Sequence, residues 1–264
     1  EEVEMPSPPA QQRQNGGHDP QRLRSEAIVV CLDCGAEMHS PWESRRPSSP
    51  TRFEVVRSAL KNVIIQKQLL DQSVSFAIVT FDDSAELVLD ATPERDLVLV
   101  SLDSIQPALE SSEMPFDLGA LSRVLRNDVT WPEGALRRVV LVFGRSDVVP
   151  VASAPLSADA LDVLYVHKRP SEPGQQCQRV YSFLTTLDFS SSSNGENDHQ
   201  QDDRKKRDGS YFCFETAASL PKLQQHCAML LAHPDLRDPQ DVMLAKLDWH
   251  KPPSYLDVAG SSGS

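Results

Sequence analysis

The chain has 264 residues, of which 39% are hydrophobic, and its 26 basic and 38 acidic side chains give a formal net charge of −12. This acidic balance argues against broad binding to nucleic acid or to anionic membranes, which requires a basic surface. No apolar run approaches the roughly 20 residues of a membrane-spanning helix, and the five cysteines are an odd number for a disulfide framework. We therefore expect a soluble, intracellular protein of the mixed α/β class.

Composition divides the chain into one globular unit with polar ends. Residues 1–25 are rich in Pro, Gln and Gly, and we expect a disordered lead-in because so few apolar groups cannot offset the entropy of ordering. The globular pattern spans residues 26–234 and contains a polar insertion at 190–209. Residues 235–264 are predicted to be a tail, and its terminal Gly/Ser run is a linker that we exclude from functional interpretation.

Short apolar runs alternate with segments of helical periodicity in the globular unit. The predicted strands are residues 27–32, 75–81, 86–89, 138–143, 163–167 and 211–215. The predicted helices are residues 53–70, 97–109, 117–126, 177–187 and 220–232, with a helical turn at 158–161. Thr51 and Glu54 have the spacing of a capping box before the first helix. This order predicts a doubly wound, mainly parallel six-stranded sheet with helices on both faces and one antiparallel hairpin strand.

The loop after the first strand carries no signature of nucleotide binding or of thiol catalysis. Residues 33–38 (DCGAEM) hold one glycine and two carboxylates, which repel a phosphate. Cys31 and Cys34 form a C-x-x-C pair, but a zinc site needs two more ligands and a redox pair belongs at a helix N-terminus. We interpret both cysteines as core-lining thiols. No G-x-S-x-G elbow is present, and none of the seven histidines has identifiable partner residues for catalysis. We therefore expect no enzymatic activity.

The beginning of the globular unit resembles a von Willebrand factor type A domain. The first strand ends in Asp33, a long helix follows, and residues 78–85 (IVTFDDSA) then form a hairpin turn. The order of strands and helices over residues 26–232 fits that fold throughout. The resemblance implies a ligand site at the carboxyl edge of the sheet, where doubly wound folds bind their ligands.

The resemblance also implies a metal-ion-dependent adhesion site built on D-x-S-x-S, a distant Thr and a later Asp. Asp33 keeps the first position, but Gly35 and Glu37 stand in place of the two serines. The threonine region reads MPFD at residues 114–117, and the exit of the fourth strand reads FGR at residues 143–145. The degenerate positions are Asp33, Gly35, Glu37, Asp117 and Gly144. Because the hydroxyl ligands are missing and Arg145 adds a cation, we expect no metal and no other cofactor.

Three segments are similar to a narrower family, the von Willebrand A-like subunits of the BRISC and BRCA-one A deubiquitinase assemblies, known as the MERIT-forty family. They are residues 31–38, residues 163–167 and, most specifically, residues 230–234 (LLAHP) at the end of the last helix. This likeness implies a non-catalytic scaffold in cytoplasm and nucleus, with a role in the DNA damage response and DNA repair. Its partners would be a BRE-like UEV subunit, a JAMM deubiquitinase and the MPN-minus scaffold partner of that enzyme, in a complex that cleaves lysine-sixty-three-linked ubiquitin chains.

Apolar residues at the end of the last helix and in the tail are the predicted partner contacts. They are Leu230, Leu231, His233, Pro234, Leu244, Leu247, Trp249 and Tyr255. Apolar anchors in an unstructured tail commonly fold onto a partner, and the alternative is that the tail packs back on its own domain.

The polar insertion holds a run of basic residues. Arg204, Lys205, Lys206 and Arg207 form either a nuclear-import patch or part of a solvated loop that neighbouring aspartates neutralise. Three rival functions stay open for the whole chain: a metal-dependent adhesion-type domain, a ubiquitin-receptor von Willebrand A domain, and a redox enzyme that uses Cys31 and Cys34.

Overall fold

The computed structural model describes residues 23–43, 46, 48–109, 115–168, 175–190 and 210–247. Most of the predicted lead-in, the basic patch Arg204–Arg207, and Trp249 and Tyr255 of the tail lie outside the described residues.

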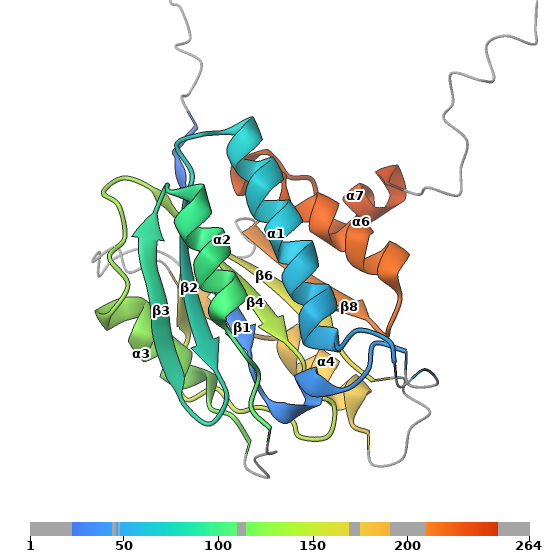
Figure 1. Cartoon of the computed structure of the whole chain (residues 1–264). Helices are drawn as coiled ribbons and strands as arrows, with labels where there is room; N and C mark the ends of the chain where they lie inside the picture. Colours follow the sequence, from blue (N-terminus) through green and yellow to red (C-terminus); the bar gives the residue numbers. More distant parts are fainter. Residues whose placement is uncertain are drawn as a thin grey trace, which may run out of the picture.

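A six-stranded sheet forms the centre of the molecule, in the order β3-β2-β1-β4-β6-β8 (Figure 1). Its strands are β1 (Glu26–Asp33), β2 (Ser75–Phe81), β3 (Ala85–Thr92), β4 (Leu136–Phe143), β6 (Ala160–Val166) and β8 (Tyr211–Thr216). All neighbouring pairs are parallel except β2 and β3, which form the expected antiparallel hairpin. The predicted fold class is therefore confirmed. A small second sheet that the sequence did not indicate pairs β5 (Leu156–Ser157) with β7 (Phe189–Ser190).

Helices cover both faces of the large sheet (Figure 1). One face carries α1 (Arg52–Leu70), α2 (Arg95–Ser104) and α6 (Leu220–Leu230), and the other carries α3 (Leu118–Asn127) and α4 (Cys177–Leu184). Side chains of β1 alternate between the two cores, with Val30 on the α1 side and Val29 on the α3 side. In the described ranges, no helix is long and apolar enough to cross a membrane.

The start of α1 follows the capping box that the sequence predicts. The Thr51 hydroxyl accepts a hydrogen bond from the Glu54 N–H at 3.1 Å, and the Glu54 carboxylate accepts one from the Thr51 N–H at 2.7 Å. Several other predicted boundaries differ from the structure: the helix expected to end at residue 187 ends at Leu184, and the strand expected at residues 86–89 extends to Thr92. Residues 158–161 do not form a helical turn because β6 begins at Ala160, and the helix expected to end at residue 109 ends at Ser104.

The folded domain continues past Pro234, where the sequence placed its end. The 3₁₀ helix η2 (Pro234–Leu236) leads to Arg237, whose side chain is fully buried and forms a bidentate ion pair with Asp162 at 2.6 and 3.0 Å. Its guanidinium lies 4.6 Å from the centre of the Phe212 ring. The short helix α7 (Gln240–Lys246) then packs on α6 and the sheet core through partly buried side chains. The predicted tail is therefore folded as far as Leu247.

Arg237 belongs to a buried group of five charges at the amino edge of the sheet. Arg138 of β4 binds Asp162 at 2.7 Å and Glu26 of β1 at 2.8 Å, and Lys67 of α1 also pairs with Glu26. Burial by itself would raise the pKa of Asp162, but Arg138 and Arg237 outweigh it and hold that pKa below its usual value.

The three cations of this group also bind backbone carbonyls at the C-terminal end of α6 and just after it. Arg138 donates to the Leu230 carbonyl at 2.7 Å, Lys67 to the Leu231 carbonyl at 3.0 Å, and Arg237 to the Ala232 carbonyl at 3.1 Å. Since the C-terminal end of a helix carries partial negative charge, it balances the excess of one cation in the group.

Candidate functional site at the carboxyl edge of the sheet

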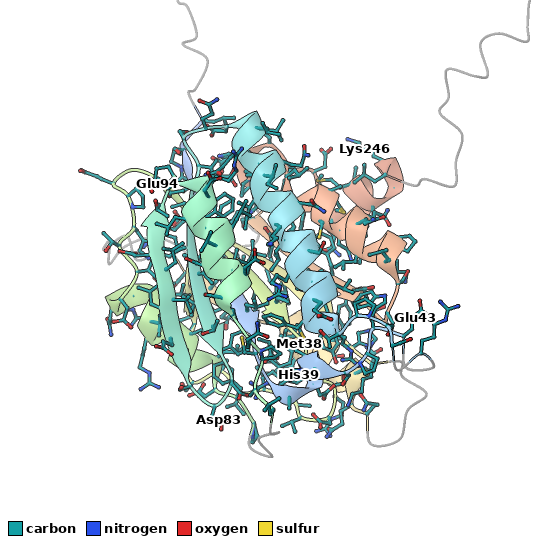
Figure 2. All side chains as sticks on the ribbon, in the orientation of Figure 1. Met38, His39, Glu43, Asp83, Glu94 and Lys246 are labelled. Carbon is teal, nitrogen blue, oxygen red and sulfur yellow. The ribbon has the colours of Figure 1, made fainter. Side chains whose placement is uncertain are left out.

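Asp33 lies at the carboxyl edge of the sheet, fully buried, at the end of β1. One carboxylate oxygen accepts from the Gly35 N–H at 2.9 Å, and the other accepts from the Gly144 N–H at 3.0 Å. The Arg145 guanidinium completes the set through Nε and Nη2, at 3.2 to 3.3 Å. Figure 2 shows the labelled neighbours Met38, His39 and Asp83 at this end of the molecule, with Glu94 and Lys246 at the opposite end. The edge is therefore built around a buried ion pair.

Arg145 is held on every side. Its Nη2 atom also donates to the Asp82 carbonyl at 2.7 Å and to the Asp82 carboxylate at 3.1 Å, in the turn after β2. The guanidinium carbon lies 5.4 Å from the centre of the Phe116 ring and 6.0 Å from that of Phe81, and the two rings stack at 4.7 Å. Rings of this kind attract a guanidinium through their negative faces. Arg145 is thus a tethered cation: Asp33 and Asp82 bind its guanidinium, and only 7% of its surface is exposed.

Burial also governs the titration of the acidic turn. Desolvation, with help from the charges of Asp83 and Asp33, raises the pKa of Asp82 above its usual value, although Arg145 opposes the rise.

These residues do not fit the divalent metal that the resemblance implies. A side-chain Cβ added at Gly35 would lie 3.1 Å from Oδ1 of Asp33 and 3.2 Å from Nε of Arg145, so a serine at this position would be in tight contact with the ion pair. A Cβ at Gly144 would lie 2.2 Å from the Met38 sulfur. Magnesium needs several converging oxygen ligands. Here the carboxylates of Asp33 and Asp82 both face the Arg145 cation, and in the described part of the chain no three His, Cys, Asp or Glu side chains are arranged to hold a metal.

Glu37 lies at this edge with a different set of partners. Its carboxylate accepts from the Ser146 N–H at 2.8 Å and lies 3.4 Å from the Lys168 ammonium and 3.6 Å from the Arg52 guanidinium. Burial, followed by hydrogen bonding to the Asp147 carboxyl, raises the pKa of Glu37 against the opposing effect of Ser146 and Lys168. Glu37 therefore anchors the loop after β4 to η1 (Ala36–His39) rather than joining Asp33.

Asp117 also binds a different set of partners from Asp33. It caps α3 by accepting from the Gly119 N–H at 2.8 Å, and it binds Ser153 through the N–H at 3.0 Å and the hydroxyl at 2.7 Å. Of the five degenerate positions, the structure brings together Asp33, Gly35 and Gly144. From the sequence, we expected Arg145 only as a nearby cation. Its ion pair with Asp33 was not predicted, because the two residues are 112 positions apart.

Cys31 and Cys34 lie in the interior, as expected for core-lining thiols, and the other three cysteines are buried as well. All five are free. Burial raises the pKa of Cys31, and it raises that of Cys34 to about 12 with a smaller contribution from the charge of Asp33. Because the thiolate is the reactive form, neither cysteine has the environment of a redox nucleophile.

The predicted partner contacts pack largely on the domain itself. Leu230 and Pro234 are buried, so they cannot form an exposed contact surface unless the domain opens. Leu231, Leu244 and Leu247 are partly buried against the core. This packing corrects the expectation of an unstructured tail and follows from the anchoring of Arg237, which has no signature in the sequence.

His233, another predicted contact, also has a partner within the chain. Its Nε2 atom is 3.0 Å from the Arg24 carbonyl, and its Nδ1 atom accepts from the Asp235 N–H at 3.2 Å. It therefore joins the start of β1 to η2.

Comparison with protein-family models and with curated proteins found no match to the sequence. Solved structures do share its fold. The D319A mutant of the PilB minor pilin from Streptococcus sanguinis is 10% identical, with a TM-score of 0.51 over 89% of this chain and 65% of that chain. The VWA domain of SpRpn10 is 13% identical, with a TM-score of 0.47 over 76% and 93%. BatB from Bacteroides thetaiotaomicron is 15% identical, with a TM-score of 0.48 over 78% and 97%.

The TM-score of 0.51 to the PilB minor pilin shows that the chain shares its α/β fold with that protein. The strand order and the single antiparallel edge strand agree with the resemblance seen in the sequence. Identities of 10 to 15% show the fold alone and carry no partner or activity with them.

Proposed function

We propose that the chain is a non-catalytic scaffold subunit of a BRISC-type deubiquitinase assembly. In this role it binds a BRE-like UEV subunit and stabilises a complex in which a JAMM deubiquitinase and its MPN-minus partner cleave lysine-sixty-three-linked ubiquitin chains. The von Willebrand A-like fold is in keeping with a protein-interaction module. The choice of this assembly rests on the likeness of residues 31–38, 163–167 and 230–234 to the MERIT-forty family.

The observation that carries the proposal is the ion pair of Asp33 with Arg145. A von Willebrand A domain that captures ligands through a metal leaves a coordination position open to the ligand. Here a buried guanidinium binds the aspartate instead, and two aromatic rings cover it. Binding through this chain then depends on a preformed protein surface and requires no metal.

The surface that we assign to the UEV subunit lies around η2 and α7. Leu236 is 68% exposed between the buried Pro234 and Arg237, and Val242 of α7 is 39% exposed. Leu236 is the main anchor that we assign, because Pro234 and Arg237 on either side of it are buried and an exposed apolar side chain on a rigid segment is suited to act as a contact anchor. Leu236 was not among the predicted contacts, because its exposure depends on how η2 folds.

Co-expression with the UEV subunit, followed by affinity purification and size-exclusion chromatography, tests the proposal. We expect a stable complex, and Leu236→Asp should weaken it at least about tenfold because a charge then faces the interface. Leu220→Asp is the matched control, since Leu220 is also exposed, at 47%, but lies at the other end of α6. Absence of any complex with the wild-type chain would refute the scaffold role, and equal loss with both variants would refute the assigned surface.

A further inference from the structure

The last strand of the sheet, β8, has a backbone edge that faces away from β6. In the parallel pairing of these strands, alternate residues of β8 direct their N–H and C=O groups toward β6 or away from it. The backbone N–H and C=O groups of Cys213 point away from β6, where they bind Gln240. The backbone groups of Tyr211 and Glu215 share this orientation because they lie two positions away along the strand. Among the described residues, no hydrogen bond to the outward backbone groups of Tyr211 or Glu215 is formed.

A side-chain amide binds this edge at its middle residue. The Gln240 carbonyl oxygen accepts from the Cys213 N–H at 2.7 Å, and the Gln240 NH₂ group donates to the Cys213 carbonyl at 2.9 Å. An added strand would supply the same acceptor and donor to an outward-facing residue. The edge of β8 therefore already binds a peptide-like group in the free chain.

The helix that carries Gln240 is weakly held. No residue of α7 is fully buried, and seven residues are too few for a stable helix without tertiary support. Its remaining contacts are partly buried side chains, such as Met243, and a hydrogen bond from Gln225 to the Leu247 carbonyl at 3.1 Å. By contrast, Arg237 is locked by its buried ion pair. Residues 238–247 can therefore leave β8 while the charged anchor stays in place.

The surroundings of the edge suit an extended, apolar segment. Partly buried aromatic side chains flank one face of the edge, where Phe189 stacks on Tyr211 at 5.8 Å and the Tyr181 hydroxyl lies 3.5 Å from the Cys213 carbonyl. On the other face, release of α7 would uncover the core side chains of α6 and the sheet against which Met243 and Leu244 pack. Successive side chains of an added strand would cover these two faces in turn.

We propose that the edge of β8 is a strand-addition site for an extended segment of a partner protein, which replaces Gln240 at Cys213. This inference goes beyond the scaffold role, because it holds whichever assembly supplies the strand.

Removal of the covering amide tests the site directly. The probe is the acetylated, amidated peptide Lys-Thr-Val-Thr-Val-Thr-Val-Lys, titrated into Gln240→Ala and wild-type chains, with Gln178→Ala as the control for a surface amide that touches neither β8 nor α7. Since two hydrogen bonds no longer compete, the Gln240→Ala variant should bind the peptide about tenfold or more tightly than the wild type and the control. The same peptide with its six central amides N-methylated should not bind, because it cannot donate to the edge.

Hydrogen exchange provides a second measurement and also detects any unfolding of the variant. The Cys213 amide should exchange faster in Gln240→Ala and should be protected again by the peptide, while the amides of β1 stay protected and show that the sheet is intact. Equal peptide affinity in wild type and variant, binding of the N-methylated peptide, or no binding to either chain would overturn the proposal. Dimerisation of Gln240→Ala without peptide binding would overturn it as well, since a second copy would then be the occupant.

Discussion

Replacement of Arg237 by alanine should lower the free energy of unfolding by about 3–5 kcal/mol, the usual cost of removing one partner from a buried ion pair. The side chain is fully buried, it makes two hydrogen bonds to Asp162 at 2.6 and 3.0 Å, and it donates a third to the Ala232 carbonyl at 3.1 Å. Its loss leaves one Asp162 oxygen without a donor in the interior. A domain of this size loses roughly 2–4 °C in Tm for each kcal/mol, so the Tm should fall by about 6–20 °C.

Urea unfolding monitored by circular dichroism measures the effect. Arg95→Ala is the control, because Arg95 is half exposed and pairs with the exposed Asp96; it should change the free energy of unfolding by less than about 0.5 kcal/mol. Arg237→Lys should fall between the two, since an ammonium cannot form the bidentate pair. A loss below about 1 kcal/mol for Arg237→Ala would refute the claim that residues past 234 belong to the folded domain.

The loss of stability in Arg237→Ala should also depend on pH. The folded-state pKa of Asp162 is lowered, so its contribution to stability is fully present above its unfolded pKa of about 3.9 and is lost as the pH falls below it. The stability difference between wild type and Arg237→Ala should therefore be largest near neutral pH and shrink in acid. A difference that grows below pH of about 4 would contradict this assignment of the pair.

Three further predictions concern other parts of the chain. Thr51→Ala should lower the free energy of unfolding by about 1 kcal/mol through loss of the capping box, and no change in urea unfolding would show that the cap does not stabilise α1. Cys31 and Cys34 should react with a thiol reagent at neutral pH far more slowly in the folded chain than in urea, because burial raises the pKa of both; equal rates would contradict their burial. Arg145→Ala should lower the free energy of unfolding by about 3 kcal/mol or more, since it leaves Asp33 buried without its cation, and a loss within error in urea would count against the tethered-cation interpretation.

Local patterns were enough to predict most of the fold. The apolar run of β1 and the capping box at Thr51 each depend on neighbouring residues, and both appear in the structure where they were expected. The strand β6 was harder to delimit. Asp162 interrupts its apolar run, so the sequence indicates a helical turn followed by a shorter strand. The buried aspartate fits a strand only because Arg138 and Arg237 reach it from distant positions.

The candidate site was predictable only in part for the same reason. The sequence located the carboxyl edge through Asp33 and showed that the serines of a metal site are missing. It could not show that Arg145 binds Asp33, or that Gln240 binds β8, because neither pairing follows a spacing rule. The end of the domain was missed because Arg237, which stands between Leu236 and Asp238 in the sequence, resembles a solvated side chain until its partner is known.

Calorimetric titration of magnesium into the wild-type chain, followed by thermal unfolding with and without the metal, tests the central claim most directly. If Arg145 occupies the place of a divalent cation at Asp33, magnesium should release no binding heat and leave the Tm unchanged. A saturable heat of binding together with a rise in Tm would contradict the account, because it would show that this edge still holds a metal.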